Sequence, residues 1–306
     1  MNEALTDIAI VKLPYTGSLG RETSKGPEEL EKLGLVQFLG EHDCRVVENY
    51  TSQLTPSEEK EYGAWHHLGL ASRHLGDTVA SLIHRGVFVV GLLANCTGLM
   101  GMLGGLQRSG PAQDQLQVGL VWIDAHSDFN TPETTLSGML GGMPVAISTG
   151  LCLHRLRAKC GLDPALPMAC VTMMGVRNID PLEKELLDQS EIHFVSSDEV
   201  RRLDQKITGE IERLAAVSDI IYVHIDMDVL DPEEVPGHGL TVKNGPTSQE
   251  LARALHRIFL HSKTAALGIA SYPVGRDPDG RSKIAAYNLV AGAVKGMASR
   301  GDARPF

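Results

Sequence analysis

Uninterrupted apolar runs alternate along the chain with segments whose apolar residues recur at helical spacing. The uninterrupted runs predict strands at residues 8–13, 45–48, 86–93, 118–123, 170–175, 193–195, 220–225 and 265–270. The helical spacing predicts helices at residues 27–38, 57–84, 97–106, 141–149, 183–189, 209–217, 248–261 and 284–298, with Thr247 or Ser248 capping the seventh. Because the strand runs lack polar alternation, both faces of each strand are predicted to be buried, which is typical of a parallel sheet covered by helices on both sides.

No segment rich in proline or glycine separates these elements, and no internal repeat is present. The sequence therefore predicts one α/β domain over residues 1–306. In open sheets of this kind, ligands bind beyond the carboxyl ends of the strands. Side chains that directly follow the apolar runs are thus the first candidates for a functional site.

Two acidic motifs occupy such positions. They are Asp124-Ala-His126-Ser-Asp128, after the run at 118–123, and Asp226-Met-Asp228, after the run at 220–225. Alternate side chains of an extended strand point to the same face, so each motif is expected to direct its acidic groups into one space, where they would repel one another without a cation. One such motif alone is typical of a solvated turn. Two at the ends of buried strands favour a site for Mn²⁺ or a similar divalent ion, and for two ions if carboxylates bridge them.

Composition and charge narrow the possible partners. The chain has 306 residues and a net charge of −10, which argues against nucleic acid or an anionic membrane as a partner and disfavours a dicarboxylate substrate. No apolar stretch approaches the ~20 residues of a membrane span. The five cysteines form no CxxC pattern, and residues 1–5 have neither a basic region nor an apolar signal core. A cytoplasmic protein without a disulfide framework is predicted.

The two motifs resemble those of the arginase/agmatinase (ureohydrolase) family. The resemblance lies in Val-Trp-Ile-Asp124-Ala-His126-Ser-Asp128-Phe-Asn130-Thr-Pro and in His-Ile-Asp226-Met-Asp228-Val-Leu-Asp231-Pro, and it extends over most of the chain. It implies a three-layer α/β/α fold with a mainly parallel eight-stranded sheet. It also implies a binuclear manganese centre, whose bridging hydroxide attacks a guanidinium carbon, and a homo-oligomer, commonly a trimer or hexamer.

Six residues match the metal-ligand positions of that family. One ion is expected to be held by Asp124, Asp128, Asp226 and Cys96, and the other by His126 and Asp228 with the shared Asp124 and Asp226. Cys96 stands where the family has a histidine, and its softer thiolate shifts the preference of the site from Mn²⁺ toward Zn²⁺, Fe²⁺ or Co²⁺. The alternative is that Cys96 is only a small buried residue and that one ion is held loosely. Asp231 is expected to support the turn beyond the ligands.

Two further departures concern the reaction itself. Gly141 stands where the family has a histidine that carries protons to the departing amine, and the segment that begins at Ala270 lacks the glutamate that holds the guanidinium group. Some relatives that act on N-hydroxyarginine share the cysteine. These departures favour a substrate modified at its distal end, such as an N-hydroxyguanidino amino acid.

Asp128 and His238 are the candidate catalytic residues. The glycines on either side of His238 would let it replace the missing histidine, since an imidazole exchanges protons near neutral pH. The alternative is a solvent-exposed loop histidine without a catalytic role. His224 is a weaker candidate, because a buried strand would hold it away from solvent.

Four more residues match positions that bind the amino-acid end of an arginase substrate. Asn130 and Ser137 match those that hold the α-carboxylate, and Asp180 and Glu183 match those that hold the α-ammonium group. The alternative is that the first two cap a loop and the second two open a helix. An agmatinase-like substrate would have no use for a carboxylate-binding pair.

Three functions are consistent with this sequence. The first is a metal-dependent hydrolase of a C–N bond in a guanidino- or N-hydroxyguanidino-type amino acid, a small arginine-like molecule. The second is a low-efficiency arginase or agmatinase, which Gly141 and Ala270 disfavour. The third is a catalytically silent arginase-fold protein, which the near-complete ligand set disfavours because clustered buried charge costs stability without metal.

Overall fold

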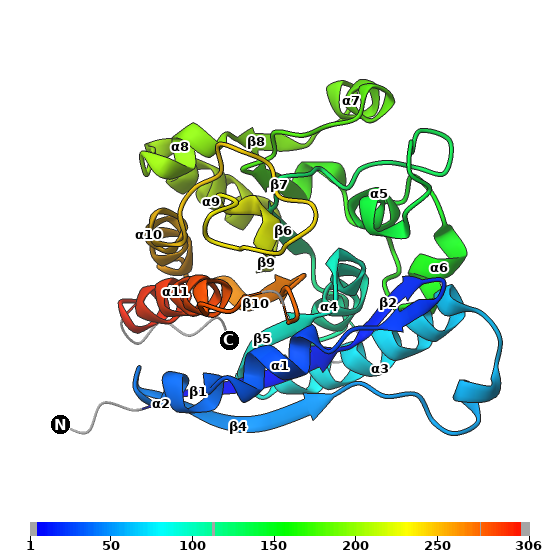
Figure 1. The fold of residues 1–306 in the computed structure, drawn as a ribbon, viewed down its shortest axis with the longest axis horizontal. Coiled ribbons are helices and arrows are strands. Elements are labelled where there is room, and N and C mark those ends of the chain that lie inside the picture. Colours follow the sequence, from blue (N-terminus) through cyan, green and yellow to red (C-terminus); the bar gives the residue numbers. More distant parts are fainter. Residues whose placement is uncertain (1–4, 112–113, 276, 301–306) are drawn as a thin grey trace.

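An eight-stranded parallel sheet runs through the molecule, with helices on both of its faces (Figure 1). The computed structural model describes residues 5–111, 114–275 and 277–300. The strand order is β4-β1-β5-β10-β9-β6-β7-β8, and each neighbouring pair is parallel. The strands are β1 (Thr6–Leu13), β4 (Cys44–Thr51), β5 (Phe88–Leu93), β6 (Val118–Ile123), β7 (Val171–Met174), β8 (His193–Val195), β9 (Ile220–Asp226) and β10 (Thr264–Ala270). The predicted three-layer fold and all the predicted strands are confirmed.

The helices form the two outer layers. They are α1 (Gly26–Lys32), α2 (Leu35–Gly40), α3 (Ala64–His84), α4 (Leu99–Gln107), α5 (Pro144–Ser148), α6 (His154–Lys159), α7 (Pro181–Asp188), α8 (Ser197–Arg201), α9 (Gln205–Val217), α10 (Ser248–Phe259) and α11 (Arg281–Ala298). Short 3₁₀ turns are η1 (Glu58–Lys60), η2 (Cys96–Gly98), η4 (Leu140–Gly142), η5 (Met168–Cys170) and η6 (Met227–Val229). A small antiparallel hairpin, β2 (Tyr15–Ser18) and β3 (Arg21–Thr23), was not predicted.

The continuous apolar runs are explained by two hydrophobic cores, one on each face of the sheet. In β1, Ala9 and Val11 join a core with α3 and α4, whereas Ile8 and Ile10 join a core with α10 and α11. Both faces of each central strand therefore need apolar side chains. Because the strands are parallel, their carboxyl ends meet at one edge, where the site lies.

Backbone conformation sets several helix boundaries. The predicted helix 27–38 is two helices, because Gly34 between them is left-handed, with φ of 107°. The predicted helix 57–84 is likewise interrupted before α3 by Gly63, with φ of 120°. Helix α10 begins with a capping box in which Thr247 and Glu250 each bond the backbone of the other, so Thr247 is the cap.

Gly268 in β10 allows a close approach that no other residue would permit. A Cβ atom at this position would lie 1.9 Å from the Tyr222 hydroxyl oxygen on neighbouring β9. We expect Gly268→Ala to lower the free energy of unfolding by about 3 kcal/mol, the upper range for overpacking a core. Chemical denaturation would measure this loss, and adding Tyr222→Phe should recover part of it.

Gly209 provides the control for this prediction. It lies within α9, and a Cβ atom there would meet no described atom within 4 Å. Gly209→Ala should therefore stabilise the protein by about 0.5–1 kcal/mol through helix propensity. If both substitutions changed the free energy of unfolding equally, the close approach of Gly268 to Tyr222 would not affect stability.

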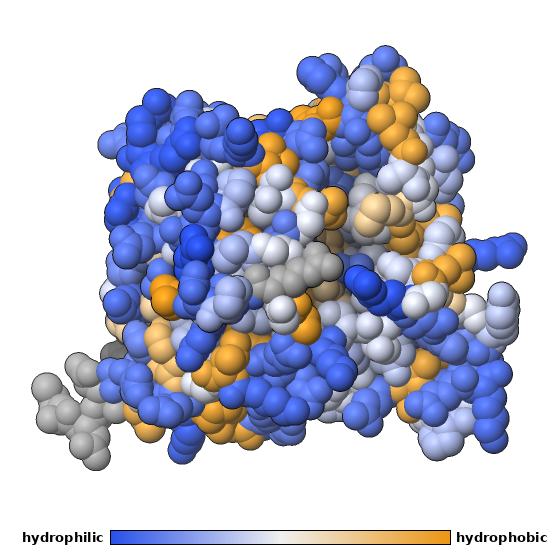
Figure 2. Space-filling view, viewed as in Figure 1, coloured by the Kyte–Doolittle hydropathy of each residue, from blue (hydrophilic) through white to orange (hydrophobic). Residues whose placement is uncertain are grey.

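None of the helices within residues 5–111, 114–275 and 277–300 combines the length and the apolar character needed to cross a bilayer. Hydrophilic side chains cover most of the face shown in Figure 2, with small apolar groups between them. The prediction that residues 1–5 lack the features of a signal segment concerns mostly Met1–Ala4, which lie outside the described residues.

Candidate metal centre

Four carboxylates, a thiol and two imidazoles gather at the carboxyl ends of β5, β6 and β9. They form three overlapping groups, and within each group the potential ligand atoms lie within 4.8 Å of one another. The groups are Cys96, Asp124 and Asp128; Asp124, His126 and Asp228; and Asp226, Asp228 and His238. All six predicted metal-ligand residues are thus brought together, and His238 joins them.

The first motif reaches this space by a turn and not by strand alternation. Strand β6 ends at Ile123, and Asp128 has a left-handed backbone with φ of 46°. The amide of His126 donates to Asp124 Oδ1 over 2.7 Å, which holds the turn. The expectation that these residues continue an extended strand is therefore wrong, although their side chains do converge.

The second motif turns in the same way. Asp226 is the last residue of β9, and Asp228 lies in η6. The amide of Asp228 donates to Asp226 Oδ1 over 2.9 Å, and the amide of Ala125 donates to Asp228 Oδ1 over 3.3 Å. Both carboxylates are therefore fixed by backbone donors while they still face the first motif.

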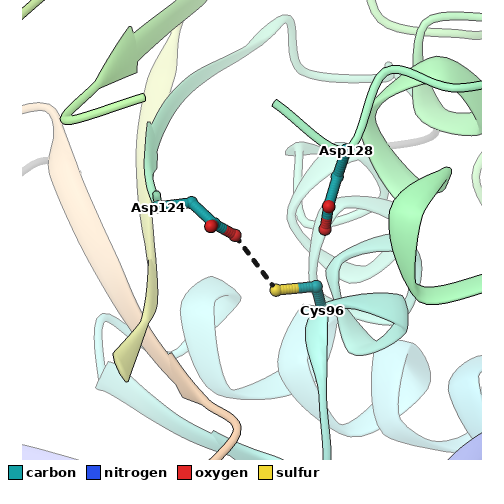
Figure 3. A group of neighbouring side chains, drawn as sticks. All are labelled: Cys96, Asp124 and Asp128. Atoms are coloured by element: carbon teal, nitrogen blue, oxygen red, sulfur yellow. Dashed lines mark hydrogen bonds between the residues drawn. The ribbon is translucent and has the colours of Figure 1, made fainter. Parts of the chain in front are cut away.

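Cys96 lies between the two motifs. Its buried Sγ is 2.9 Å from Asp226 Oδ2 and 3.5 Å from Asp124 Oδ2, and Asp128 points into the same space (Figure 3). The side chain of Asn95 accepts from the Thr97 amide and so forms the turn that presents Cys96. Burial, followed by the charges of Asp226 and Asp124, raises the pKa of the Cys96 thiol well above its usual value. A bound cation would reverse this effect and favour the thiolate.

The electrostatics of the carboxylates fit a divalent cation. Burial, and then the negative charges of neighbouring aspartates, raises the pKa of Asp124 well above its usual value; burial also raises that of Asp128. In the part of the chain that the structure describes, no lysine or arginine forms an ion pair with any of the four aspartates. Buried acidic groups without a basic partner are the donor set that a hard or borderline metal ion requires.

The two histidines of the cluster differ in their settings. His126 Nδ1 lies 3.2 Å from Asp228 Oδ2 and 3.4 Å from Asp124 Oδ1. Although burial lowers the pKa of His126, these carboxylates raise it to about 11. His238, on the loop after β9, has a side chain only 8% exposed, with Nε2 3.7 Å from Asp226 Oδ1. Its Nδ1 accepts from the Leu240 amide, so the structure places this loop histidine beside the cluster.

Two residues near the cluster were given no place in it by the sequence. Ser271 follows β10 with a left-handed φ of 64°, and its hydroxyl donates to Asp226 Oδ2. Its position after a predicted strand was the available signal. His224 is fully buried, stacks on Trp122 with ring centres 4.6 Å apart, and hydrogen-bonds the Tyr222 hydroxyl. Burial lowers the pKa of His224 to about 3, so it is neutral.

The four predicted substrate-binding residues are only partly assembled. Asn130 Nδ2 donates to Asp180 Oδ2 over 3.1 Å. Glu183 accepts from the amides of Phe129 and Asp180, the latter as part of the capping box of α7. Ser137 is exposed on the loop before η4, where its hydroxyl accepts from the Met139 amide and lies 3.5 Å from Thr135 Oγ1. Glu183 thus has the helix-opening contacts of the alternative interpretation, and the contacts of Ser137 are within its own loop.

A cavity of about 550 Å³ adjoins the cluster. It is lined by Arg21, Thr23, Ser24, Lys25, Ala94, Gly237, His238, Gly239, Ser271, Tyr272, Pro273 and Val274. His238 and Ser271 connect it to Asp226. None of the four predicted substrate-binding residues lines it.

Comparisons with known proteins agree with this geometry. Residues 6–294 match the model of the Arginase family. An arginase from Bacillus caldovelox is 32% identical to this chain, and the match covers 61% of this chain and 62% of that arginase. This match thus spans less than two thirds of the length of that relative. An arginase from Entamoeba histolytica is 28% identical, and the match covers 88% of this chain and 90% of that arginase. The native structure of the B. caldovelox arginase superposes with a TM-score of 0.81 at 25% identity and covers 95% of this chain and 99% of that one. The chain therefore belongs to the arginase family.

Proposed function

We propose that this protein hydrolyses a C–N bond in a guanidino- or N-hydroxyguanidino-type amino acid with the help of two divalent metal ions. The observation that carries the proposal is the group of four buried aspartates without a lysine or arginine partner among the described residues. Keeping such a group costs stability unless cations bind to it. This cost also argues against a catalytically silent protein.

The proposed ligand sets follow the three groups of the cluster. Cys96, Asp124, Asp128 and Asp226 would hold one ion, and His126 and Asp228 with the shared Asp124 and Asp226 would hold the other. Mn²⁺ is the first candidate because most ligands are carboxylates, while the Cys96 thiolate suits Zn²⁺, Fe²⁺ or Co²⁺ better. Two such ions supply a water molecule whose pKa is low enough for it to act as a nucleophile at neutral pH.

The chain's own residues would orient the substrate and move protons. Asn130 lies two residues beyond Asp128 and is hydrogen-bonded to Asp180. We propose that these two residues bind the amino-acid end of the substrate, together with Glu183 and Ser137. Asp128, which lies in one ligand group with Cys96 and Asp124, would accept a hydrogen bond from the attacking water molecule. His238 would carry a proton to the departing nitrogen, since its Nε2 faces the cluster from a loop at the cavity.

Two positions favour a substrate with a modified distal nitrogen. Gly141, in η4, supplies no proton donor, and neither Ala270 at the end of β10 nor the adjacent Ser271 offers the carboxylate that a cationic guanidinium would need. N-hydroxylation makes the guanidino group less basic, so the group carries less positive charge and depends less on a carboxylate partner. A low-efficiency arginase is the second candidate, supported by the similarity to arginases over 6–294.

The remaining aspects of the proposal rest on the family. We propose a homo-oligomer, a trimer or hexamer, that acts in the cytoplasm as one domain spanning residues 1–306. The partner is a small guanidino-type molecule, and neither nucleic acid nor membrane is expected to bind, in view of the net charge of −10.

Product assays on metal-loaded protein test the proposed function. We expect purified protein incubated with Mn²⁺ to bind about two ions per chain, as measured by metal analysis, and to release hydroxyurea from N-hydroxyarginine faster than urea from arginine. Agmatine, which lacks the carboxylate, should be the poorest of the three. The proposal fails if none of the three compounds yields urea or hydroxyurea with Mn²⁺, Zn²⁺, Fe²⁺ or Co²⁺.

A further inference from the structure

The wall of the cavity beside Asp226 is basic, in contrast to the acidic protein as a whole. Arg21, Lys25 and His238 line it, together with hydroxyl side chains and backbone, and no aspartate or glutamate is among the lining residues that the structure describes. In the described part of the chain neither Arg21 nor Lys25 takes part in an ion pair. Because salt screens charges beyond about 8 Å, these nearby cations outweigh the net charge of −10 for a ligand in the cavity.

The segment that carries both cations is held in place. The amide of Ser24 donates to the Pro14 carbonyl over 2.8 Å, and the amide of Gly26 donates to Ser24 Oγ over 3.1 Å. Gly26 lies so close to the turn after β10 that a Cβ atom there would be 2.9 Å from the Tyr272 carbonyl oxygen. The backbone beside Lys25 therefore lies close to the turn that carries Ser271, and the exposed side chains of Arg21 and Lys25 line the same cavity as Ser271.

The two sides of the cluster thus have different chemistry. Asn130 and Asp180 follow Asp128 and offer an amide and a carboxylate, as an amino-acid end requires. The cavity adjoins Asp226 through His238 and Ser271, and its described lining residues include two cations and no carboxylate. Like charges at such a position disfavour a cationic group and favour an anionic one.

We propose that this cavity binds a carboxylate carried on the distal nitrogen of the substrate. The inference rests on the proposed function and names its substrate class, Nω-carboxyalkyl derivatives of arginine. Arg21 and Lys25 would donate hydrogen bonds to the carboxylate, which would also neutralise the guanidinium beside Ser271.

The reaction balances as a hydrolysis. The oxygen of one water molecule forms a bond to the guanidinium carbon, and the bond from that carbon to the amino acid's own nitrogen breaks. The nitrogen leaves as an ammonium group and takes up the two water protons with the electron pair of the broken bond. The products are a diamino acid and a urea that keeps the carboxyalkyl substituent.

Binding of two ligands that differ in a dicarboxylate substituent on the distal nitrogen tests the proposal. We expect argininosuccinate to bind the metal-loaded protein at least about tenfold more tightly than L-arginine in calorimetric titrations. Arg21→Gln and Lys25→Gln should each weaken argininosuccinate about tenfold or more and leave arginine unchanged, and Lys25→Arg should keep most of the binding. Lys32→Gln, which removes an exposed α1 lysine paired with Glu28 outside the cavity, is the matched control.

Two other results of these titrations would overturn the proposal. Equal binding of the two ligands would show that the cavity does not recognise the distal group. Equal weakening of both ligands in the two variants would show that the cations hold the α-carboxylate instead. The product assay stands apart from these titrations: no urea-type product from any guanidino compound, with the expected binding pattern intact, would reject the hydrolase but not the carboxylate site.

Discussion

Asp226→Asn is expected to remove bound metal from both positions of the cluster. Asp226 contacts Cys96 and forms a ligand group with Asp228 and His238. It is also one of the two carboxylates that are proposed to bridge the ions. Loss of a direct ligand should weaken metal binding by more than about a hundredfold, since even residues that only orient ligands account for 10–100-fold. Metal analysis after dialysis and product assays would measure the losses, and we expect turnover to disappear with the metal.

Stability separates this outcome from misfolding. Removing one of several neighbouring buried carboxylates relieves repulsion, so metal-free Asp226→Asn should unfold at a temperature equal to or above that of the metal-free parent. It should gain no further stability on addition of Mn²⁺. Asp231→Asn is the control, because Asp231 binds the Glu233 amide and is absent from the ligand groups. Full metal content in Asp226→Asn would refute the shared-ligand assignment.

His238→Ala is expected to lose most of its turnover while it retains its metal. If His238 delivers the proton to the departing nitrogen, its removal should cost about 10²–10⁴-fold in turnover. Gly141→His should then restore part of the activity, above all on unmodified arginine. The site has room for this change, since a Cβ atom at Gly141 would meet no described atom within 4 Å. Steady-state kinetics on N-hydroxyarginine and arginine, with metal analysis of each variant, would measure both effects.

Gly142→His is the matched control for the restoration. A Cβ atom at Gly142 is equally free of described neighbours, and Gly142 lies in the same 3₁₀ turn. A histidine there should restore nothing. If His238→Ala instead loses metal, His238 is a ligand and not a proton carrier, since it lies within ligand distance of Asp226 and Asp228. Unchanged turnover would leave the reaction to the metal ions alone.

Uninterrupted apolar runs were sufficient to predict the sheet because its central strands are buried on both faces. Short elements without such a signal escaped prediction. The hairpin of β2 and β3 has only a few residues in each strand and turns at Gly20, with φ of 75°. Helix α8 is one turn long and depends on a capping box between Ser196 and Glu199. In these cases a local cap or turn, not an apolar face, decides the conformation.

The sequence was sufficient to predict which candidate ligands lie together, but not the geometry that brings them together. The acidic motifs stand out because they follow apolar runs. The left-handed backbone at Asp128 and Ser271, which aims both side chains, has no periodic signature. The cavity was also beyond the sequence, because its wall joins Arg21 and Lys25 to residues that follow β9 and β10, more than two hundred positions later.

The long-range order of the sheet has a consequence for how the protein folds. Cys96 and Asp226, whose side chains touch, are 130 residues apart, and β5, β10, β9 and β6 must all pair before the ligands meet. Contacts of such sequence separation form late and slow folding. Metal ions cannot nucleate this chain as they do a small zinc module, whose ligands are neighbours. The metal ions would bind only after the sheet has formed. The metal-free protein must therefore fold despite the repulsion between its own aspartates.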